Sequence, residues 1–148
     1  MKFAEGYTMT LPVLLDQVSD RLVAFEKEML EKYVPVPVWV DWVVTFDENE
    51  DNDLGSSFHL NRDDVSAVIG FEKIDGRWRV CFIEMDCVDE TLESEMAHVT
   101  SWTPMAELPL ALRLKLLEGN PLKELELMLI ERQQQLAERA KRVLRDLG

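Results

Sequence analysis

Residues 47–53, DENEDND, place side-chain oxygens at alternate positions of the chain. This alternation matches the first half of a helix–loop–helix calcium site, whose carboxylate and amide ligands also alternate. A complete site further needs glycine at its sixth position and a bidentate glutamate at its twelfth, but counting from Asp47 these positions hold Asn52 and Phe58. We therefore interpret the segment as a solvated acidic loop and expect no metal site. The sequence leaves open whether the loop attracts a cation.

Residues suited to nucleophilic chemistry are few and scattered. The chain has two histidines, His59 and His98, and two cysteines, Cys81 and Cys87. No CxxC or Cys/His ligand spacing occurs, and the GxSxG and glycine-rich phosphate-binding patterns are absent. Because thiols in a chain without an export signal are typically reduced, we expect both cysteines to be free. We expect no cofactor and no catalytic residues, which favours a protein that is not an enzyme.

The segment GFEKIDGRWRVCF predicts a β-hairpin. Its Asp75-Gly76 pair is typical of a two-residue turn in which both residues have positive φ. The turn fixes a register that places Glu72 opposite Arg79 as a cross-strand ion pair. Alternation along the strand then directs Trp78 toward the core. The alternative is a binding motif made of Trp78 and its flanking arginines, and the register disfavours it.

A strand is also predicted at residues 36–46, VPVWVDWVVTF, because β-branched and aromatic residues dominate it. One of its faces is apolar throughout, and the other is mixed through Trp39, Asp41 and Val43. With the hairpin, this gives a sheet that packs one face on helices and keeps a second, half-apolar face. Large exposed apolar patches are rare on monomers, so we expect a helix, a partner or a second copy to cover the second face. Shorter strands are expected at SSFHL and MAHVTSW.

Three helices are predicted from apolar residues at three- and four-residue steps. The first covers residues 10–33 with Thr10 as its N-cap, and the VPVP segment ends it. A short helix ends at Gly119, and Asn120 caps a long final helix. The stretch from Arg132 to Gln135 makes the middle of the final helix polar, which excludes full burial. Its far end therefore either lies in solvent or pairs with a partner.

Composition limits the class of protein and of partner. The 148 residues fit a single domain, 1–148, with an ordinary globular balance of 47% hydrophobic and 30% charged residues. The net charge of −13 disfavours nucleic acid and anionic membranes as partners. Residues 131–148 hold five Lys/Arg against three Asp/Glu, a net +2, which leaves −15 on the other 130 residues. No secretory signal and no bilayer-spanning apolar run are found, which indicates a cytoplasmic protein.

We therefore expect an α+β domain with an N-terminal helix, an antiparallel four- to five-stranded sheet and two C-terminal helices. The predicted function is that of a non-enzymatic protein–protein interaction or regulatory module, such as an adaptor, inhibitor or assembly factor. Its expected partner is another protein or a second copy of the chain. The alternative is a small-molecule-binding protein or enzyme with a pocket between sheet and helices, with polar groups from Asp41, His59, Glu84 or His98. The predicted binding residues are Trp39, Asp41, Val43, His59 and His98.

Overall fold

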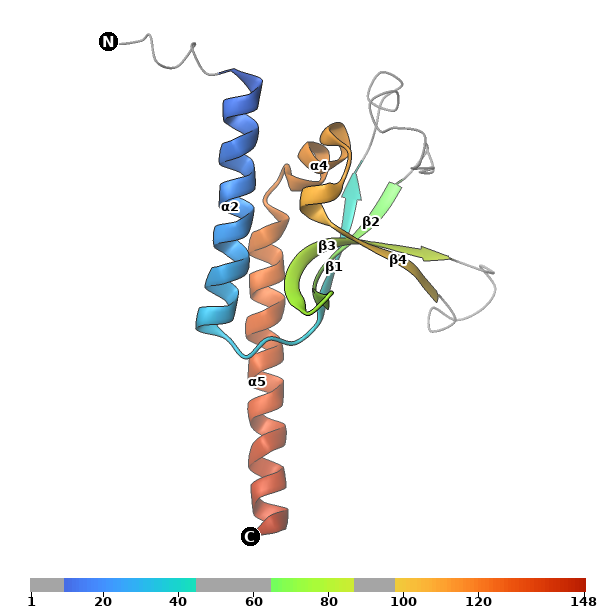
Figure 1. Cartoon of the computed structure of the whole chain (residues 1–148). Coiled ribbons are helices and arrows are strands. Elements are labelled where there is room, and N and C mark those ends of the chain that lie inside the picture. The colour runs from blue at the N-terminus through green and yellow to red at the C-terminus, as the bar shows by residue number, and fades with distance from the viewer. Residues whose placement is uncertain (1–9, 45–64, 87–97) are drawn as a thin grey trace, which may run out of the picture.

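The computed structural model describes residues 10–44, 65–86 and 98–148, which form an α+β fold (Figure 1). The predicted N-terminal helix, antiparallel sheet and two C-terminal helices are confirmed, and the described residues contain four strands. The predicted strand at SSFHL and the acidic loop at 47–53 lie outside the described residues. In chain order the elements are α2 (Leu11–Lys32), β1 (Val38–Val44), β2 (Val65–Ile74), β3 (Arg77–Asp86), β4 (His98–Pro104), the 3-10 turn η2 (Met105–Glu107), α4 (Leu110–Leu117) and α5 (Pro121–Leu147).

The sheet is an antiparallel meander in the order β1-β2-β3-β4. The turn between β2 and β3 has the predicted geometry, with φ of 51° at Asp75 and 82° at Gly76. The predicted hairpin register is confirmed, and it places Glu72 opposite Arg79. Because the turn leaves no freedom in the pairing, every side chain of the hairpin is assigned to one face of the sheet.

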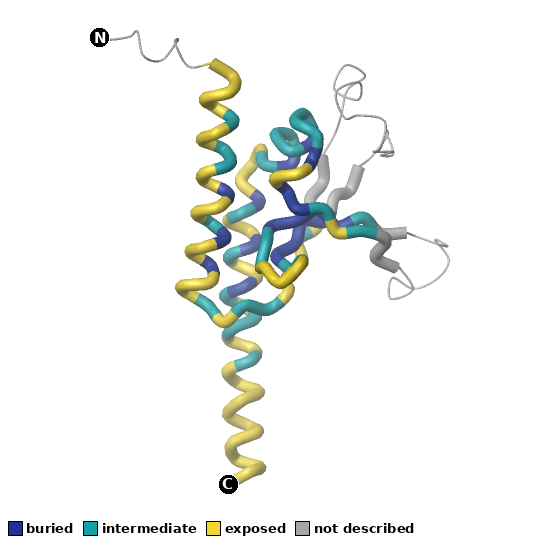
Figure 2. The backbone as a smooth tube through the Cα atoms, in the orientation of Figure 1, coloured by how far each residue is buried: buried dark blue, intermediate teal, exposed yellow. Residues whose placement is uncertain are grey.

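One face of the sheet packs against helices α2, α4 and α5, and the main core lies between this face and the helices (Figures 1 and 2). Trp78 belongs to this face as predicted, and its ring centroid lies 5.5 Å from that of Phe71. Burial of this apolar surface is the principal force holding the layers together. The buried members of the core are Leu22, Met29, Val38, Ile69, Phe71, Val80, Phe82, Met105, Leu108, Leu112, Leu116, Leu125 and Leu129.

The fully buried residues of helix α2 all lie in its C-terminal half (Figure 2). Its buried residues are Leu22, Glu26 and Met29, whereas Leu11 at the start of the predicted stripe is 52% exposed. Thr10 occupies the predicted N-cap position, but its side chain makes no capping hydrogen bond. The periodicity therefore predicted the helix correctly, while the length of the packed layer decides which of its turns are buried.

Helix α5 also packs through its first half only. Leu125 and Leu129 are buried, and every residue after Leu136 is exposed. Asn120 is the N-cap residue, but it has left-handed backbone geometry (φ 62°) and makes no side-chain capping bond. In the polar middle of α5, the side-chain amide of Gln133 makes two hydrogen bonds with the backbone of Val34, which follows α2. No helix in the described ranges is long and apolar enough to cross a lipid bilayer.

Candidate functional site

The second face of the sheet has a small apolar cluster of its own, made by Val68, Cys81 and Ile83. All three side chains are buried, and Ile74 packs beside them. The described helices contribute nothing to this cluster, because α2, α4 and α5 all pack on the opposite face. Among the described residues, the cover of this cluster therefore comes from other side chains of the sheet.

Two tryptophans from the outer strands contribute to this cover. Trp39 of β1 lies opposite Gly70, and Trp102 of β4 lies opposite Ile83. A Cβ atom placed on Gly70 would lie 2.6 Å from Cδ1 of Ile83 and 3.0 Å from Cδ1 of Trp39. The absence of a side chain at Gly70 therefore lets Trp39 and Ile83 close over the middle of the sheet.

A single carboxylate joins the two indoles. Oε2 of Glu72 accepts a hydrogen bond from Nε1 of Trp39 and a second one, of 3.2 Å, from Nε1 of Trp102. The two side chains remain 37% and 44% exposed, respectively. We call Trp39 and Trp102, held by Glu72, the tryptophan pair. It places two large aromatic surfaces in fixed orientations at the surface of the protein.

The role of Glu72 differs from the predicted one. Glu72 and Arg79 are register partners, but the guanidinium of Arg79 instead pairs with Glu107 at 3.3 Å. The two indole N–H groups donate hydrogen bonds to the carboxylate of Glu72. The turn η2 brings Glu107 within reach of Arg79. The predicted ion pair between Glu72 and Arg79 is therefore absent, and each of the two residues has other partners.

Cys81 lies at the centre of the cluster and is not suited to nucleophilic chemistry. Its Sγ donates a hydrogen bond to the carbonyl oxygen of Gly70 at 3.6 Å, and the residue is free but buried. Burial raises the pKa of the Cys81 thiol to about 12, and the nearby charge of Glu72 acts in the same direction. A thiol with so high a pKa stays protonated at neutral pH and is a poor nucleophile.

The predicted binding residues do not converge on one point. Trp39 and Asp41 are exposed on the second face, with Asp41 opposite Val68 in the register. Val43 and His98 lie in β1 and β4, where the structure describes only their backbone, and His59 lies outside the described residues. A binding role for Val43, His59 and His98 stays a prediction. Trp102 and Glu72 were missed, since a pairing across four strands leaves no local pattern in the sequence.

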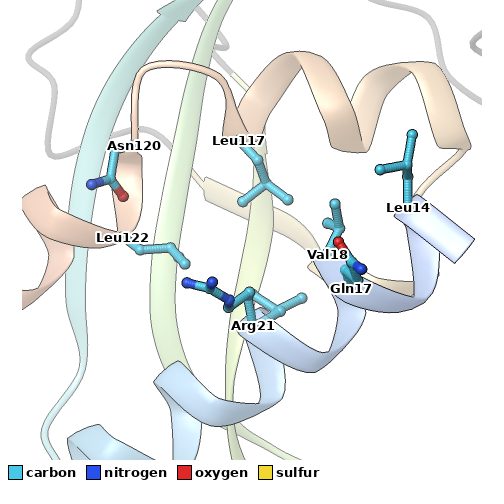
Figure 3. Close-up of a pocket in the computed structure, with 8 residues that line it drawn as sticks. Leu14, Gln17, Val18, Arg21, Leu117, Asn120 and Leu122 are labelled. Carbon is cyan, nitrogen blue, oxygen red and sulfur yellow. The ribbon is translucent and has the colours of Figure 1, made fainter. Parts of the chain in front are cut away.

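Two cavities lined by described residues lie between helices. One cavity of about 370 Å³ opens between α2 and the segment joining α4 to α5 (Figure 3). A neighbouring one of about 510 Å³ shares Arg21, Asn120 and Leu122 with it. None of the polar residues predicted to line a pocket is among their walls, and Glu84 instead accepts a hydrogen bond of 2.7 Å from Ser101. The first cavity is lined by Leu14, Gln17, Val18, Arg21, Leu22, Leu117, Asn120 and Leu122.

Glu26 is a buried acidic residue that the sequence pattern did not predict. It lies on the packed face of α2, and its Oε2 accepts a hydrogen bond of 2.7 Å from the backbone N–H of Val80. Burial raises the pKa of Glu26, although the Val80 hydrogen bond and the charges of Arg79 and Arg77 act in the opposite direction. A carboxylate on the apolar stripe, four residues after Leu22, was the available signal. The hydrogen bond to Val80 indicates that Glu26 holds α2 against β3.

The described residues provide no candidate metal centre, and comparison with known proteins provides no family. No cluster of three or more His, Cys, Asp or Glu side chains within the described ranges could hold a metal ion. Comparison of the chain with family models, curated proteins and solved structures found no match.

Proposed function

We propose that the protein is a non-enzymatic interaction module that binds a basic segment of a partner protein on the tryptophan pair. The observation that carries this proposal is the single carboxylate of Glu72 holding two half-exposed indoles on a face that no described helix covers. Tryptophan is the residue most enriched among the few side chains that carry binding energy in protein interfaces.

Preorganisation supports a binding role for the tryptophan pair. Immobilising a flexible side chain on binding costs about 0.5–1.5 kcal/mol. The hydrogen bonds from Trp39 and Trp102 to Glu72 have already fixed the two rings in the free protein. A partner that docks on them avoids most of this cost, so a small contact surface can bind with useful affinity.

The chemistry of the surface favours a cationic partner. A guanidinium or ammonium group placed over an indole face is attracted by the ring quadrupole, and Glu72 and Asp41 add negative charge on the same face. The net charge of −13 further attracts basic segments over longer distances. An arginine or lysine beside an apolar residue would therefore complement the tryptophan pair.

The test is selection of random peptides displayed on phage against the immobilised full chain. We expect the selected peptides to carry Arg or Lys beside an apolar residue, and Trp39→Ala or Trp102→Ala to weaken their binding about tenfold. Glu72→Gln keeps an oxygen acceptor for the indoles and should reduce the preference for basic residues. The matched control is Leu127→Ala, an exposed apolar residue of α5 that should bind as the wild type does. Selection of peptides without basic residues, or equal binding by the tryptophan variants, would refute the proposal.

A second candidate function is the binding of a small apolar carboxylate between α2 and α5. The cavity of about 370 Å³ has the size of a ligand site, its walls are largely leucine and valine, and Arg21 lies in it (Figure 3). Isothermal titration with dodecanoate tests this function, and Arg21→Gln should weaken binding about tenfold. Absence of heat change with dodecanoate at about 1 mM would exclude it.

A further inference from the structure

The apolar stripe that packs the first half of α5 continues in the same helical phase along its second half. Leu125 and Leu129 are buried on this stripe, whereas Val143 and Leu147 further along it are 47% and 79% exposed. Figures 1 and 2 show the C-terminal part of α5 extending past the sheet and past the end of α2, with exposed residues along its length. We call residues 134–147 the projecting half of α5. Its sequence is suited to packing, but no described element covers it.

The other side of the projecting half is suited to solvent. Lys141 and Glu138 form an ion pair of 3.2 Å away from the apolar stripe. Fourteen residues at about 1.5 Å each make a helix of about 21 Å, and isolated helices of this length are marginal in water. A helix that continues so far past its own domain with an apolar stripe is therefore expected to gain stability from a partner.

We propose that the projecting half of α5 pairs with the same segment of a second copy of the chain in an antiparallel two-helix contact. In this register Leu136 lies opposite Leu147 of the second copy, and Ala140 lies opposite its Val143. The small alanine therefore faces the branched valine, and leucine faces leucine. Each contact occurs twice because the arrangement has two-fold symmetry.

The charges beside the stripe agree with this register. Arg139 and Asp146 are seven residues apart on the same flank, too far for an ion pair within one helix, and neither has an ion pair with another described residue. In the antiparallel arrangement, Arg139 of each copy lies beside Asp146 of the other. The opposed helix dipoles also attract each other. The segment is therefore self-complementary in both shape and charge.

A parallel pair would lose these contacts. Ala140 would face Ala140 and leave a gap, and Arg139 would lie beside Leu144 of the second copy. Within the antiparallel dimer, Leu147 of the second copy also comes near Val34, which is 66% exposed next to Gln133. The contact is short and buries less than the roughly 1,200 Å² of a stable complex, so we expect a dissociation constant between about 10 µM and about 1 mM.

Sedimentation equilibrium of the full chain between about 10 µM and about 1 mM tests the pairing. The wild type should shift from monomer to dimer over this range, and Val143→Glu should raise the dissociation constant at least about tenfold. The matched control is Leu127→Glu, because Leu127 is also exposed on α5 but lies on the opposite side from the stripe. This control should dimerise as the wild type does.

Charge reversal tests the register. Arg139→Asp alone and Asp146→Arg alone each create like-charge contacts and should weaken the homodimer about three- to tenfold. An equimolar mixture of the two variants should recover the wild-type affinity, since the mixed dimer contains two opposite-charge contacts.

Three results would overturn the inference. They are a wild type that stays monomeric at about 1 mM, an equal loss of association in Leu127→Glu and Val143→Glu, and a mixture of charge variants that fails to recover. The inference does not depend on the tryptophan pair, which lies on the other side of the sheet from α5. Peptide binding and self-association can therefore succeed or fail independently.

Discussion

The carboxylate of Glu26 accepts a hydrogen bond from the backbone N–H of Val80 at 2.7 Å, and this bond ties the middle of α2 to β3. Strand β4 pairs with β3 only as far as Pro104 opposite Cys81, so no residue of β4 lies beside Val80. A side chain from a helix therefore replaces the acceptor that another strand would supply. A buried amide without an acceptor would be costly, which explains a carboxylate on an otherwise apolar face.

Substitutions at Glu26 should separate its hydrogen bond from its charge. Glu26→Gln keeps an oxygen acceptor for Val80 and removes the buried charge, so its free energy of unfolding at pH 7 should stay within about 1 kcal/mol of the wild type. Glu26→Leu leaves the Val80 N–H without an acceptor and should lose about 1–3 kcal/mol. Urea denaturation measures both. A Leu variant as stable as the Gln variant would contradict the role given to this bond.

The raised pKa of Glu26 also predicts a pH dependence. The folded protein holds the Glu26 proton more tightly than the unfolded chain, whose ordinary value is 4.5. The stability that this proton contributes is fully present below pH 4.5 and is lost as pH rises through the raised folded pKa. Relative to Glu26→Gln, the wild type should therefore lose stability across the range just above pH 4.5. Parallel curves for the two proteins would disprove the linkage.

The tryptophan pair should control access to Cys81. In a Cys87→Ser background, Cys81 should react slowly with a disulfide reagent at pH 8, because the thiol is buried and its pKa is about 12. Trp102→Ala opens the cover and should raise the rate at least about tenfold, which absorbance kinetics can follow. Leu127→Ala serves as the control. Unchanged reactivity in the Trp102 variant would show that other residues bury Cys81.

Alkaline pH should destabilise the protein through the same thiol. The pKa of Cys81 is raised from 9.0 in the free thiol to about 12 in the fold. Its contribution to stability is therefore fully present below pH 9 and is lost as pH rises from 9 toward 12. Cys81→Ala removes this thiol, so its free energy of unfolding should fall less than that of the wild type between pH 8 and pH 10. An equal loss of unfolding free energy in the two proteins would contradict the role given to the Cys81 thiol.

Gly70 should tolerate no side chain. A Cβ atom there would lie 2.6 Å from Cδ1 of Ile83 and 3.0 Å from Cδ1 of Trp39, both of which cover the second face. Gly70→Ala should therefore lower the free energy of unfolding by about 1–3 kcal/mol through overpacking, and the combination with Ile83→Val should recover part of the loss. Thermal unfolding measures both. A Gly70→Ala protein as stable as the wild type would show that these side chains move aside.

Gln133 should anchor α5 to the segment after α2. Its side-chain amide donates to the carbonyl oxygen of Val34 at 2.7 Å and accepts from the Val34 N–H at 3.1 Å. Gln133→Ala should lower the free energy of unfolding by about 1 kcal/mol. The neighbouring Gln134 is exposed, so Gln134→Ala should leave the free energy of unfolding almost unchanged. Chemical denaturation of the two variants compares them directly. Equal effects would mean that the paired amide contributes nothing to stability.

The sequence alone determined the hairpin, the assignment of its faces and the existence of the helices. Asp75-Gly76 imposes one turn geometry, and the period of two along each strand then places Trp78 inside and Cys81 outside the main core. These features follow from steric rules that act over a few residues. The polar middle of α5 likewise indicated that its far end leaves the domain, as observed.

Only the tertiary structure decided which side chains meet. Trp39, Glu72 and Trp102 come from three strands, and Glu26 meets Val80 across 54 residues of chain. These contacts depend on how the twisted sheet brings distant side chains together, and local periodicity carries no information about that geometry. For the same reason the sequence left the cover of the second face undecided, whereas in the fold the tryptophans of its own outer strands contribute to it.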